Sequence, residues 1–454
     1  MSLISLNPTT GTQLASYSEM TPAEVTGALD SAVAAFHDWR RASFADRATV
    51  MRGVARALRT RKAELARLMA LEMGKPLNQG ESEIEKCATT CEYFADHAAQ
   101  YLAQEEVATE ARRSFVLYQP LGVVLGVMPW NFPFWQALRY AAPTLMAGNT
   151  TILKHSSNVT GCALAIEELF DAAGAPKGVF RTLRLGSARV GEVIDDARVA
   201  AVTLTGSTPA GQAIAARAGQ VLKPAVLELG GSDPYVILDD ADLEAAVATC
   251  VASRLINSGQ SCVAAKRFIC TPVRHAAVER LFTDMMARKR MGDPLDNPDV
   301  GPQARLDLRD DLHRQVQDSI ARGARALVGG TLPETPGAFY PPTVLSAVRK
   351  GMPAYDEELF GPVAAVIEAH DEVDAIRIAN DTSFGLGAAI FTRDVERGTR
   401  LAAEELAAGN CFVNAFVRSD PRLPFGGIKQ SGYGRELGIW GIREFVNVKT
   451  VYVQ

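Results

Sequence analysis

Between residues 21 and 73, apolar side chains recur every three or four positions, which is the spacing of one face of an α-helix. The run Thr21-Pro22-Ala23-Glu24 has the composition of a capping box with proline at the first helical position. Gly74 and then Pro76 mark the end of the last of these helices. The pattern therefore predicts helices at the start of the chain.

From residue 122 onward, short apolar runs alternate with helical stretches. Several runs are apolar on both faces, as in parallel strands that helices cover on either side. This alternation predicts an α/β fold with doubly wound parallel sheets. The expected strands are 122–128, 150–154, 201–205, 225–229, 235–238, 267–271, 363–369, 387–392, 410–414 and 449–453.

Composition places the chain among ordinary soluble proteins of more than one lobe. The chain has 454 residues, of which 47% are hydrophobic and 22% charged. A net charge of -5 argues against a nucleic-acid partner, which favours basic proteins. The most apolar window, near residues 121–135, contains Pro129 and Pro133 and is too short for a membrane span.

The cysteines indicate a reducing compartment. Seven cysteines are an odd number, in a chain large enough to fold without disulfides. Cys87 and Cys91 lack a second Cys/His pair, so no metal site is expected. The N-terminus shows no secretory signal pattern. We expect a cytoplasmic protein that binds neither membrane nor nucleic acid.

Three residues are candidates for chemistry. Cys262 follows the polar run Asn257-Ser258-Gly259-Gln260-Ser261 and could be a nucleophile, although most free cysteines are small buried apolar residues. Glu228 ends an apolar run before two glycines; it could cap a helix or pair with an arginine. Near a thiol of pKa about 8.5, the same carboxylate could be the general base.

Asn131 lies between Pro129 and Pro133, which hold the backbone on either side of its amide. A rigid amide can donate a hydrogen bond to a developing oxyanion, and one such donor contributes about 3 kcal/mol. Taken alone, the motif is better explained as an ordinary turn between a strand and a helix.

Two segments suit a cofactor. Lys154 closes an expected strand, and α/β proteins bind ligands at the carboxyl edge of the sheet. Gly206 and Ser207 follow another expected strand and open a helix, whose N-terminus favours phosphate. Neither a GxGxxG pattern nor a Walker loop is present.

Together these segments resemble the aldehyde dehydrogenase superfamily, in the same order and along nearly the whole chain. The motifs that carry the resemblance are PWNFP at 129–133, ILK at 152–154, TGS at 205–207, LELGG at 227–231, GQSC at 259–262, EELFGP at 357–362 and PFGGIKQSG at 424–432.

The resemblance implies a fold of two doubly wound parallel-sheet domains and a small β oligomerisation element. Residues 1–101 and 121–229 would form the dinucleotide-binding domain, and 230–439 the catalytic domain with the nucleophilic cysteine. Residues 102–120 and 440–454 would form the oligomerisation element of a homodimer or homotetramer.

The resemblance also assigns catalytic roles. Cys262 would attack an aldehyde, with Asn131 and the backbone N–H of Cys262 as the oxyanion hole. Hydride transfer to the nicotinamide would leave a thioester, which water activated by Glu228 would hydrolyse. A base for hydrolysis favours a free acid as the product.

For the cofactor, the resemblance implies binding by a set of residues along the dinucleotide: Trp130, Lys154, His155, Ser156, Ser157, Gly206, Ser207, Leu229, Glu358 and Phe360. Relatives strict for NAD often carry an acid three residues after the lysine, where this chain has Ser157. Without that acid a 2′-phosphate is not repelled, and Lys154 would attract it. The prediction is NADP as the preferred cofactor, with NAD as an alternative.

For the substrate, Arg139 and Ser419 stand where semialdehyde-oxidising relatives bind a distal carboxylate. Residues 154–162 and 414–421 resemble the succinate-semialdehyde branch, which predicts oxidation of succinate semialdehyde to succinate. One departure is Ile256, where some of those relatives carry another arginine.

Three alternatives stay open. The substrate could be another small or carboxylated aldehyde, such as glutarate semialdehyde. A cofactor-free cysteine hydrolase or acyltransferase would need a histidine partner, and neither His155 nor His275 lies in a matching motif. A non-catalytic binding protein on the same fold is the third.

Overall fold

The computed structural model describes residues 2–454 and confirms the helices expected at the start of the chain. They are α1 (Pro22–Trp39), α2 (Phe44–Thr60), α3 (Lys62–Met73) and α4 (Leu77–Tyr101). The predicted capping box is present, because the Thr21 side chain accepts from Glu24 N and the Glu24 carboxylate accepts from Thr21 N. Gly74 ends α3 in the left-handed region, at φ 79°. The hairpin of β1 (Ser2–Leu6) and β2 (Gln13–Ser18) before α1 was not predicted.

A six-stranded sheet forms the centre of the first lobe, in the order β17-β9-β8-β5-β6-β7. The strands are β5 (Val123–Met128), β6 (Thr150–His155), β7 (Phe180–Thr182), β8 (Val199–Thr205), β9 (Ala225–Glu228) and β17 (Gly432–Tyr433). The pairs are parallel except β17 with β9. Residues from α1 and from α7 (Val190–Asp195) and α8 (Thr208–Gln220) cover one face. The other face packs against α2–α4, α5 (Pro133–Met146) and α6 (Thr160–Ala172), so the sheet is doubly wound as predicted.

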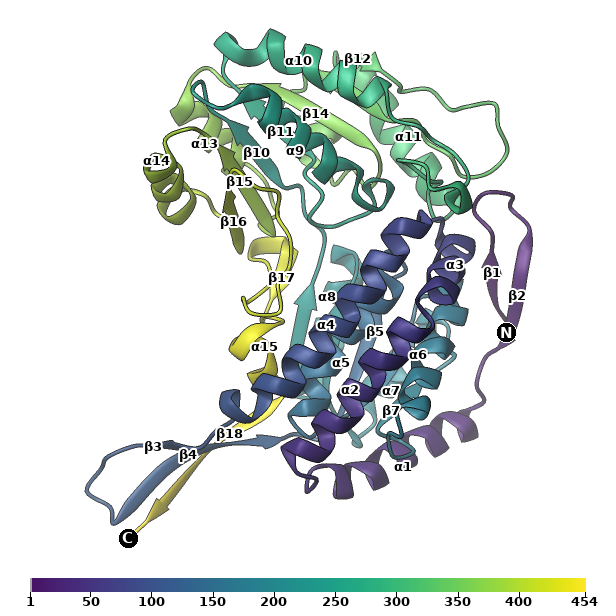
Figure 1. Ribbon diagram of the computed structural model, residues 1–454, viewed down its shortest axis with the longest axis vertical. Helices are drawn as coiled ribbons and strands as arrows, with labels where there is room; N and C mark the ends of the chain where they lie inside the picture. The colour runs from purple at the N-terminus through teal and green to yellow at the C-terminus, as the bar shows by residue number, and fades with distance from the viewer. Residues whose placement is uncertain (1) are drawn as a thin grey trace.

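A seven-stranded sheet forms the second lobe, in the order β12-β13-β14-β11-β10-β15-β16 (Figure 1). The strands are β10 (Pro234–Ile237), β11 (Arg267–Cys270), β12 (Arg325–Val328), β13 (Thr343–Ser346), β14 (Val363–Glu368), β15 (Gly387–Phe391) and β16 (Asn410–Val413). On one face lie α9 (Leu243–Leu255) and α10 (Pro272–Ala287); on the other lie α11 (Leu306–Ala321), α12 (Pro353–Asp356) and α13 (Glu372–Asn380). Helix α14 (Val395–Arg400) precedes β16.

Each large sheet carries one antiparallel pair, which the expectation of parallel sheets did not include. These pairs are β17 with β9 and β12 with β13. In each case the added strand is at the edge, where an antiparallel strand on a parallel sheet is common.

A three-stranded sheet projects from the body of the molecule (Figure 1). It consists of β3 (Glu105–Glu106), β4 (Arg113–Pro120) and β18 (Val446–Val453), in the order β18-β4-β3, and α15 (Gly438–Arg443) leads into it. Strand β18 pairs with β4 along its whole length, from Val446 opposite Pro120 to Val453 opposite Arg113. None of the helices within residues 2–454 combines the length and apolar character needed to cross a membrane.

The strand ends of one large sheet face the strand ends of the other, and this arrangement positions the site. Strand order in the first sheet reverses between β5 and β8, because β6 and β7 follow on one side and β9 on the other. Such a switch point opens a crevice at the carboxyl ends of the strands. Residues 229–233 run directly from the end of β9 to the start of β10. The carboxyl edge of the first sheet therefore faces the amino edge of the second.

Candidate active site

Cys262 lies in a loop between α9 and β11, at the amino edge of the second sheet. Before the cysteine, Asn257 and Ser258 have φ of 53° and 57°, and Gly259 has φ of 79°. Three successive left-handed residues are costly unless the surroundings hold them. A β-carbon at position 259 would collide with the backbone of Gly361, so glycine is required there.

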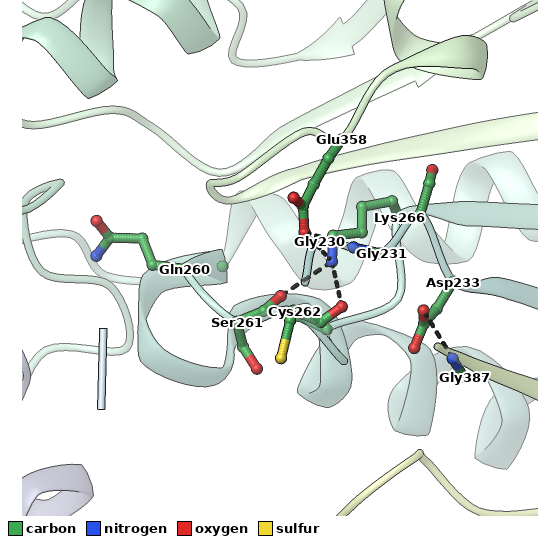
Figure 2. Close-up of polar contacts among 12 residues, drawn as sticks. Gly230, Gly231, Asp233, Gln260, Ser261, Cys262, Lys266, Glu358 and Gly387 are labelled. Atoms are coloured by element: carbon green, nitrogen blue, oxygen red, sulfur yellow. Dashed lines mark hydrogen bonds and ion pairs between the residues drawn. The ribbon is translucent and has the colours of Figure 1, made fainter. Parts of the chain in front are cut away.

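Two buried cations hold this loop from the inside. Arg254 donates to Ala265 O at 2.9 Å. Lys266 donates to Ser261 O at 2.9 Å and to Cys262 O at 2.6 Å, and its ammonium lies 3.3 Å from Glu358 Oε1. In Figure 2 the Cys262 sulfur points away from this lysine. The backbone at the thiol is therefore fixed by charge-assisted hydrogen bonds, which are stronger than neutral ones.

Asn131 lies in the turn between β5 and α5 and is bonded to the cysteine loop. Its Nδ2 donates to Gln260 O at 3.2 Å, and its own carbonyl accepts from Asn257 Nδ2 at 2.6 Å. The Asn131 amide has a second N–H, which can serve an oxyanion. The structure thus places the Asn131 amide in contact with Gln260, which precedes Cys262 by two positions in the chain.

A buried ion pair anchors the turn that carries Asn131. Both oxygens of Glu83 on α4 are used: one accepts from Phe134 N and Trp135 N, each at 2.9 Å, and the other pairs with Lys75. The carboxylate therefore occupies the N-terminus of α5, where negative charge is favoured. Sequence reasoning did not identify this pair.

Glu228 ends β9 with its side chain almost fully buried, and neither carboxylate oxygen has a hydrogen-bond partner among the described residues. Burial raises the pKa of Glu228 well above its ordinary value, and the positive charge of Arg139 opposes the shift. Burial also raises the pKa of the Cys262 thiol to about 12, against the charges of Arg139 and Lys266. Attack by Cys262 therefore requires a base. The charge of Glu228 also raises the pKa of the thiol, so this carboxylate acts electrostatically on Cys262.

A cavity of about 640 Å³ opens beside the thiol. Its walls come from α4, α5, α9 and the loops before β11 and after β16. The lining side chains include Cys262, Phe132, Trp135, Arg139, Lys86, Phe416, Arg418, Ser419 and Phe425. Aromatic walls with a few polar groups are typical of a site for a small organic substrate.

Arg139 and Ser419 both line the cavity, but each already has a partner. Arg139 is buried, forms an ion pair with Glu436 and donates to Thr205 Oγ1 at 3.2 Å. Ser419 Oγ accepts from Lys86 Nζ at 2.7 Å. The expectation of a free arginine for the substrate's carboxylate did not anticipate Glu436, and Lys86 was not identified at all.

The cofactor candidates gather at the carboxyl edge of the first sheet. Lys154 lies near the end of β6 and is buried. Burial lowers the pKa of Lys154, and the charge of Glu19 opposes this shift. Among residues 2–454 the lysine forms no ion pair. Gly206 and Ser207 connect β8 to the N-terminus of α8, and Leu229 packs on Gly211 in the first turn of that helix. A buried lysine that forms no ion pair and a helix N-terminus fit a phosphate-bearing dinucleotide.

Three neighbouring candidates have different surroundings. Both ring nitrogens of His155 are engaged, since Nδ1 accepts from Ser156 N and Nε2 donates to Pro133 O at 2.9 Å. Its ring therefore connects β6 to the Asn131 turn and has no nitrogen left for a cofactor. Ser156 Oγ donates to Asn158 Oδ1. Ser157 begins the turn before α6; its backbone carbonyl accepts from Thr160 Oγ1, and its hydroxyl makes no hydrogen bond among residues 2–454.

The remaining candidates come from both sides of the crevice. The rings of Trp130 and Phe360 meet edge to face, with centroids 5.8 Å apart. Glu358 Oε1 accepts from Gly231 N at 3.0 Å and pairs with Lys266 (Figure 2). Glu358 is thus connected through one lysine to the carbonyl of Cys262. Within residues 2–454, no three His, Cys, Asp or Glu side chains are grouped to hold a metal ion.

A thiol beside an aromatic cavity, together with a buried lysine and a helix N-terminus that suit a dinucleotide, fits a cysteine-dependent dehydrogenase. The family comparison agrees: the aldehyde dehydrogenase family matches residues 2–451, and the chain belongs to that family.

Two curated relatives and one solved structure illustrate the similarity. The succinate semialdehyde dehydrogenase, NAD(P)+, of Escherichia coli is 47% identical over 99% of this chain and 97% of its own length. Succinate-semialdehyde dehydrogenase 1, NADP(+), of Mycobacterium tuberculosis is 47% identical over 100% of both chains. The crystal structure of succinic semialdehyde dehydrogenase from Streptococcus pyogenes in complex with NADP+ superposes with a TM-score of 0.97, at 36% identity and 99% coverage of each chain.

Proposed function

We propose that this chain oxidises succinate semialdehyde to succinate, with NADP as the preferred cofactor and NAD as an alternative. The observation that carries the proposal is one cavity in which a nucleophilic cysteine and several cationic side chains line the same space. A short aldehyde with a distal carboxylate matches both features. The names of the relatives from Escherichia coli and Mycobacterium tuberculosis support the same substrate.

In the proposed reaction, Glu228 takes up the thiol proton and passes it to solvent, which restores the carboxylate, and Cys262 attacks the aldehyde carbon to give a thiohemiacetal. The second N–H of Asn131 and the backbone N–H of Cys262 stabilise its oxyanion. When bound, the nicotinamide supplies the acceptor for the hydride that leaves this carbon. A thioester remains on Cys262, and Glu228 then removes a proton from the water that hydrolyses it.

The proposed cofactor contacts are Lys154 and Ser157 toward the adenosine side, Gly206 and Ser207 toward the phosphates, and Glu358 toward the nicotinamide ribose. Trp130, Leu229 and Phe360 would pack beside the dinucleotide. Ser156 would contact the cofactor only through its backbone, because its hydroxyl donates to Asn158.

We also propose a division of the chain into three parts. Residues 1–101 and 121–229 bind the dinucleotide, and residues 230–439 carry the nucleophilic cysteine. The projecting sheet of 102–120 and 440–454 would join subunits in a homodimer or homotetramer, because an exposed sheet edge is a liability unless it is paired. Val448 and Tyr452 on β18 are exposed and apolar, as such an interface requires. The proposed location is the cytoplasm.

The test of the proposed function is a panel of aldehydes assayed with each cofactor. Succinate semialdehyde should give the highest kcat/KM, ahead of glutarate semialdehyde and of uncharged aldehydes, and one succinate should form per NADPH. Equal kcat/KM values for butanal and succinate semialdehyde would contradict the substrate assignment. Absence of aldehyde-dependent NADPH or NADH would contradict the dehydrogenase activity as a whole.

Ser157→Glu is expected to shift cofactor preference toward NAD. The new carboxylate repels a 2′-phosphate and can accept hydrogen bonds from the ribose hydroxyls. A charged hydrogen bond of this kind corresponds to about a 10- to 100-fold change in the ratio of kcat/KM for NADP to kcat/KM for NAD. Ser157→Gln has the same size without the charge and should shift the ratio much less. An unchanged ratio in Ser157→Glu would reject the assignment of this residue.

A further inference from the structure

Lys86 on α4 is the cation in the cavity that has no carboxylate partner. Its side chain is half-buried and takes part in no ion pair among residues 2–454. Nζ donates to Ser419 Oγ at 2.7 Å and lies 4.1 Å from the centroid of the Trp135 ring. A lysine desolvated in this way gains the most from an incoming anion, because nothing else in the site neutralises it.

The other charged residues around the cavity are compensated or exposed. Arg139 pairs with Glu436, and Lys289 pairs with Asp299 at 3.2 Å. Arg418 is exposed to solvent, so its interaction with a ligand is weakened by water. Lys86 therefore offers an unmatched positive charge inside the cavity that contains the thiol.

Two carboxylates act on Lys86 from nearby without neutralising it. Glu83, one turn away on α4, is bound to Lys75 and to the N-terminus of α5. Asp420 is held by Arg422, with Nη2 2.6 Å from Oδ2. Both carboxylates are thus already committed.

We propose that Lys86, together with Ser419, binds the distal carboxylate of the aldehyde substrate and is the residue that selects carboxylated over uncharged aldehydes. The proposal deepens the proposed function and rests on it. Arg139 then acts mainly on the protein's own groups: its charge is held by Glu436 and opposes the raised pKa values of Glu228 and Cys262. On this account Arg139→Ala would damage the chemistry as well as binding, whereas Lys86 can be tested by itself.

The test is Lys86→Met, which removes the charge and keeps an unbranched side chain, assayed with succinate semialdehyde and with butanal. The KM for succinate semialdehyde should rise about 10- to 100-fold, since a hydrogen bond to a charged group is lost. The kcat for the same substrate and the kcat/KM for butanal should stay within about threefold of the parent. Lys86→Arg should restore part of the affinity, because it keeps the charge.

Lys289→Met is the matched control, because Lys289 lines the same cavity but is paired with Asp299. It should leave the preference between the two aldehydes unchanged. An unchanged KM for succinate semialdehyde in Lys86→Met overturns the proposal. Parallel loss of both activities also overturns it, because that result assigns Lys86 to folding or to the chemistry. A parent enzyme without preference for succinate semialdehyde refutes the proposed function instead, so the two failures are distinguishable.

A second readout is the pH dependence of KM. Burial, then the charge of Arg139, lowers the pKa of Lys86 to about 8, while Cys87, Glu83 and Asp420 oppose the shift. Lys86 is therefore charged below this pH and neutral above it. KM for succinate semialdehyde should rise as the pH increases through about 8 and beyond, and KM for butanal should not. Lys86→Met should lack this rise; its persistence in the variant overturns the proposal.

Discussion

Cys262→Ala is expected to lower kcat/KM for aldehyde oxidation by about 10⁴-fold or more, because the covalent pathway is lost with its nucleophile. The side chain is small and half-buried, and the loop is held by Arg254 and Lys266 through backbone carbonyls rather than through the sulfur. The fold and the binding of NADP should therefore persist in the variant. Steady-state NADPH formation and cofactor titration measure the two effects separately.

Cys411→Ala is the matched control for this prediction. Cys411 is the other half-buried cysteine of the seven, and it lies in β16 away from the cavity lining. Its removal should leave kcat/KM within about threefold of the parent. Substantial aldehyde oxidation by Cys262→Ala would show that another group forms the covalent bond, or that no covalent bond forms.

Glu228→Gln is expected to reduce the steady-state kcat by about 10²- to 10⁴-fold, the usual contribution of a positioned general base. Glutamine has nearly the same shape but accepts no proton, so the thioester should form more slowly, with solvent taking up the thiol proton, and should then persist. Rapid mixing with succinate semialdehyde and NADP should give a burst of NADPH that approaches one equivalent per active site, followed by a slow phase. The role of Glu228 in taking up the thiol proton should appear as a burst slower than that of the parent enzyme.

Glu444→Gln provides a comparison for Glu228→Gln. Burial also raises the pKa of Glu444, but this carboxyl group accepts a hydrogen bond from Arg435 N, whereas neither oxygen of Glu228 has a partner among the described residues. The exchange should affect stability more than the ratio of burst to steady-state rate. A Glu228→Gln enzyme with the parent's kcat and no burst would show that water is activated by another group.

Much of the fold could be predicted from the sequence because its strongest signals are local. Strands such as β5 and β8 are apolar on both faces, and Gly74 with Pro76 defines the end of α3. The short strands β3, β7, β12, β13 and β17 were missed, because two to four residues carry no periodicity. Strand β4 was also not predicted, although its residues were expected to belong to the oligomerisation element. The β1–β2 hairpin was missed for a related reason: its strands are largely polar or exposed, and its partner surface is not adjacent in the chain.

The candidate site divides in the same way. Cys262, Glu228 and Asn131 stand in short motifs of unusual composition, so a resemblance could identify them together. The ion pair of Arg139 with Glu436 joins residues far apart in the chain, and no local pattern indicates it. Glu83 and Lys86, three residues apart on a helix, have the spacing of a solvated surface pair. Only the packing of α4 against α5 shows that both are turned inward, one to a helix N-terminus and one to the cavity.

Peptide mapping of Glu228→Gln after a single turnover with succinate semialdehyde and NADP, under acidic quench, tests whether Cys262 carries the acyl group as a thioester that Glu228 releases. A hydroxylamine-sensitive succinyl group is expected on the peptide that contains Cys262, in amount equal to the NADPH formed. NADPH formation without any acylated Cys262, or acylation of a different residue, would contradict the Cys262 thioester.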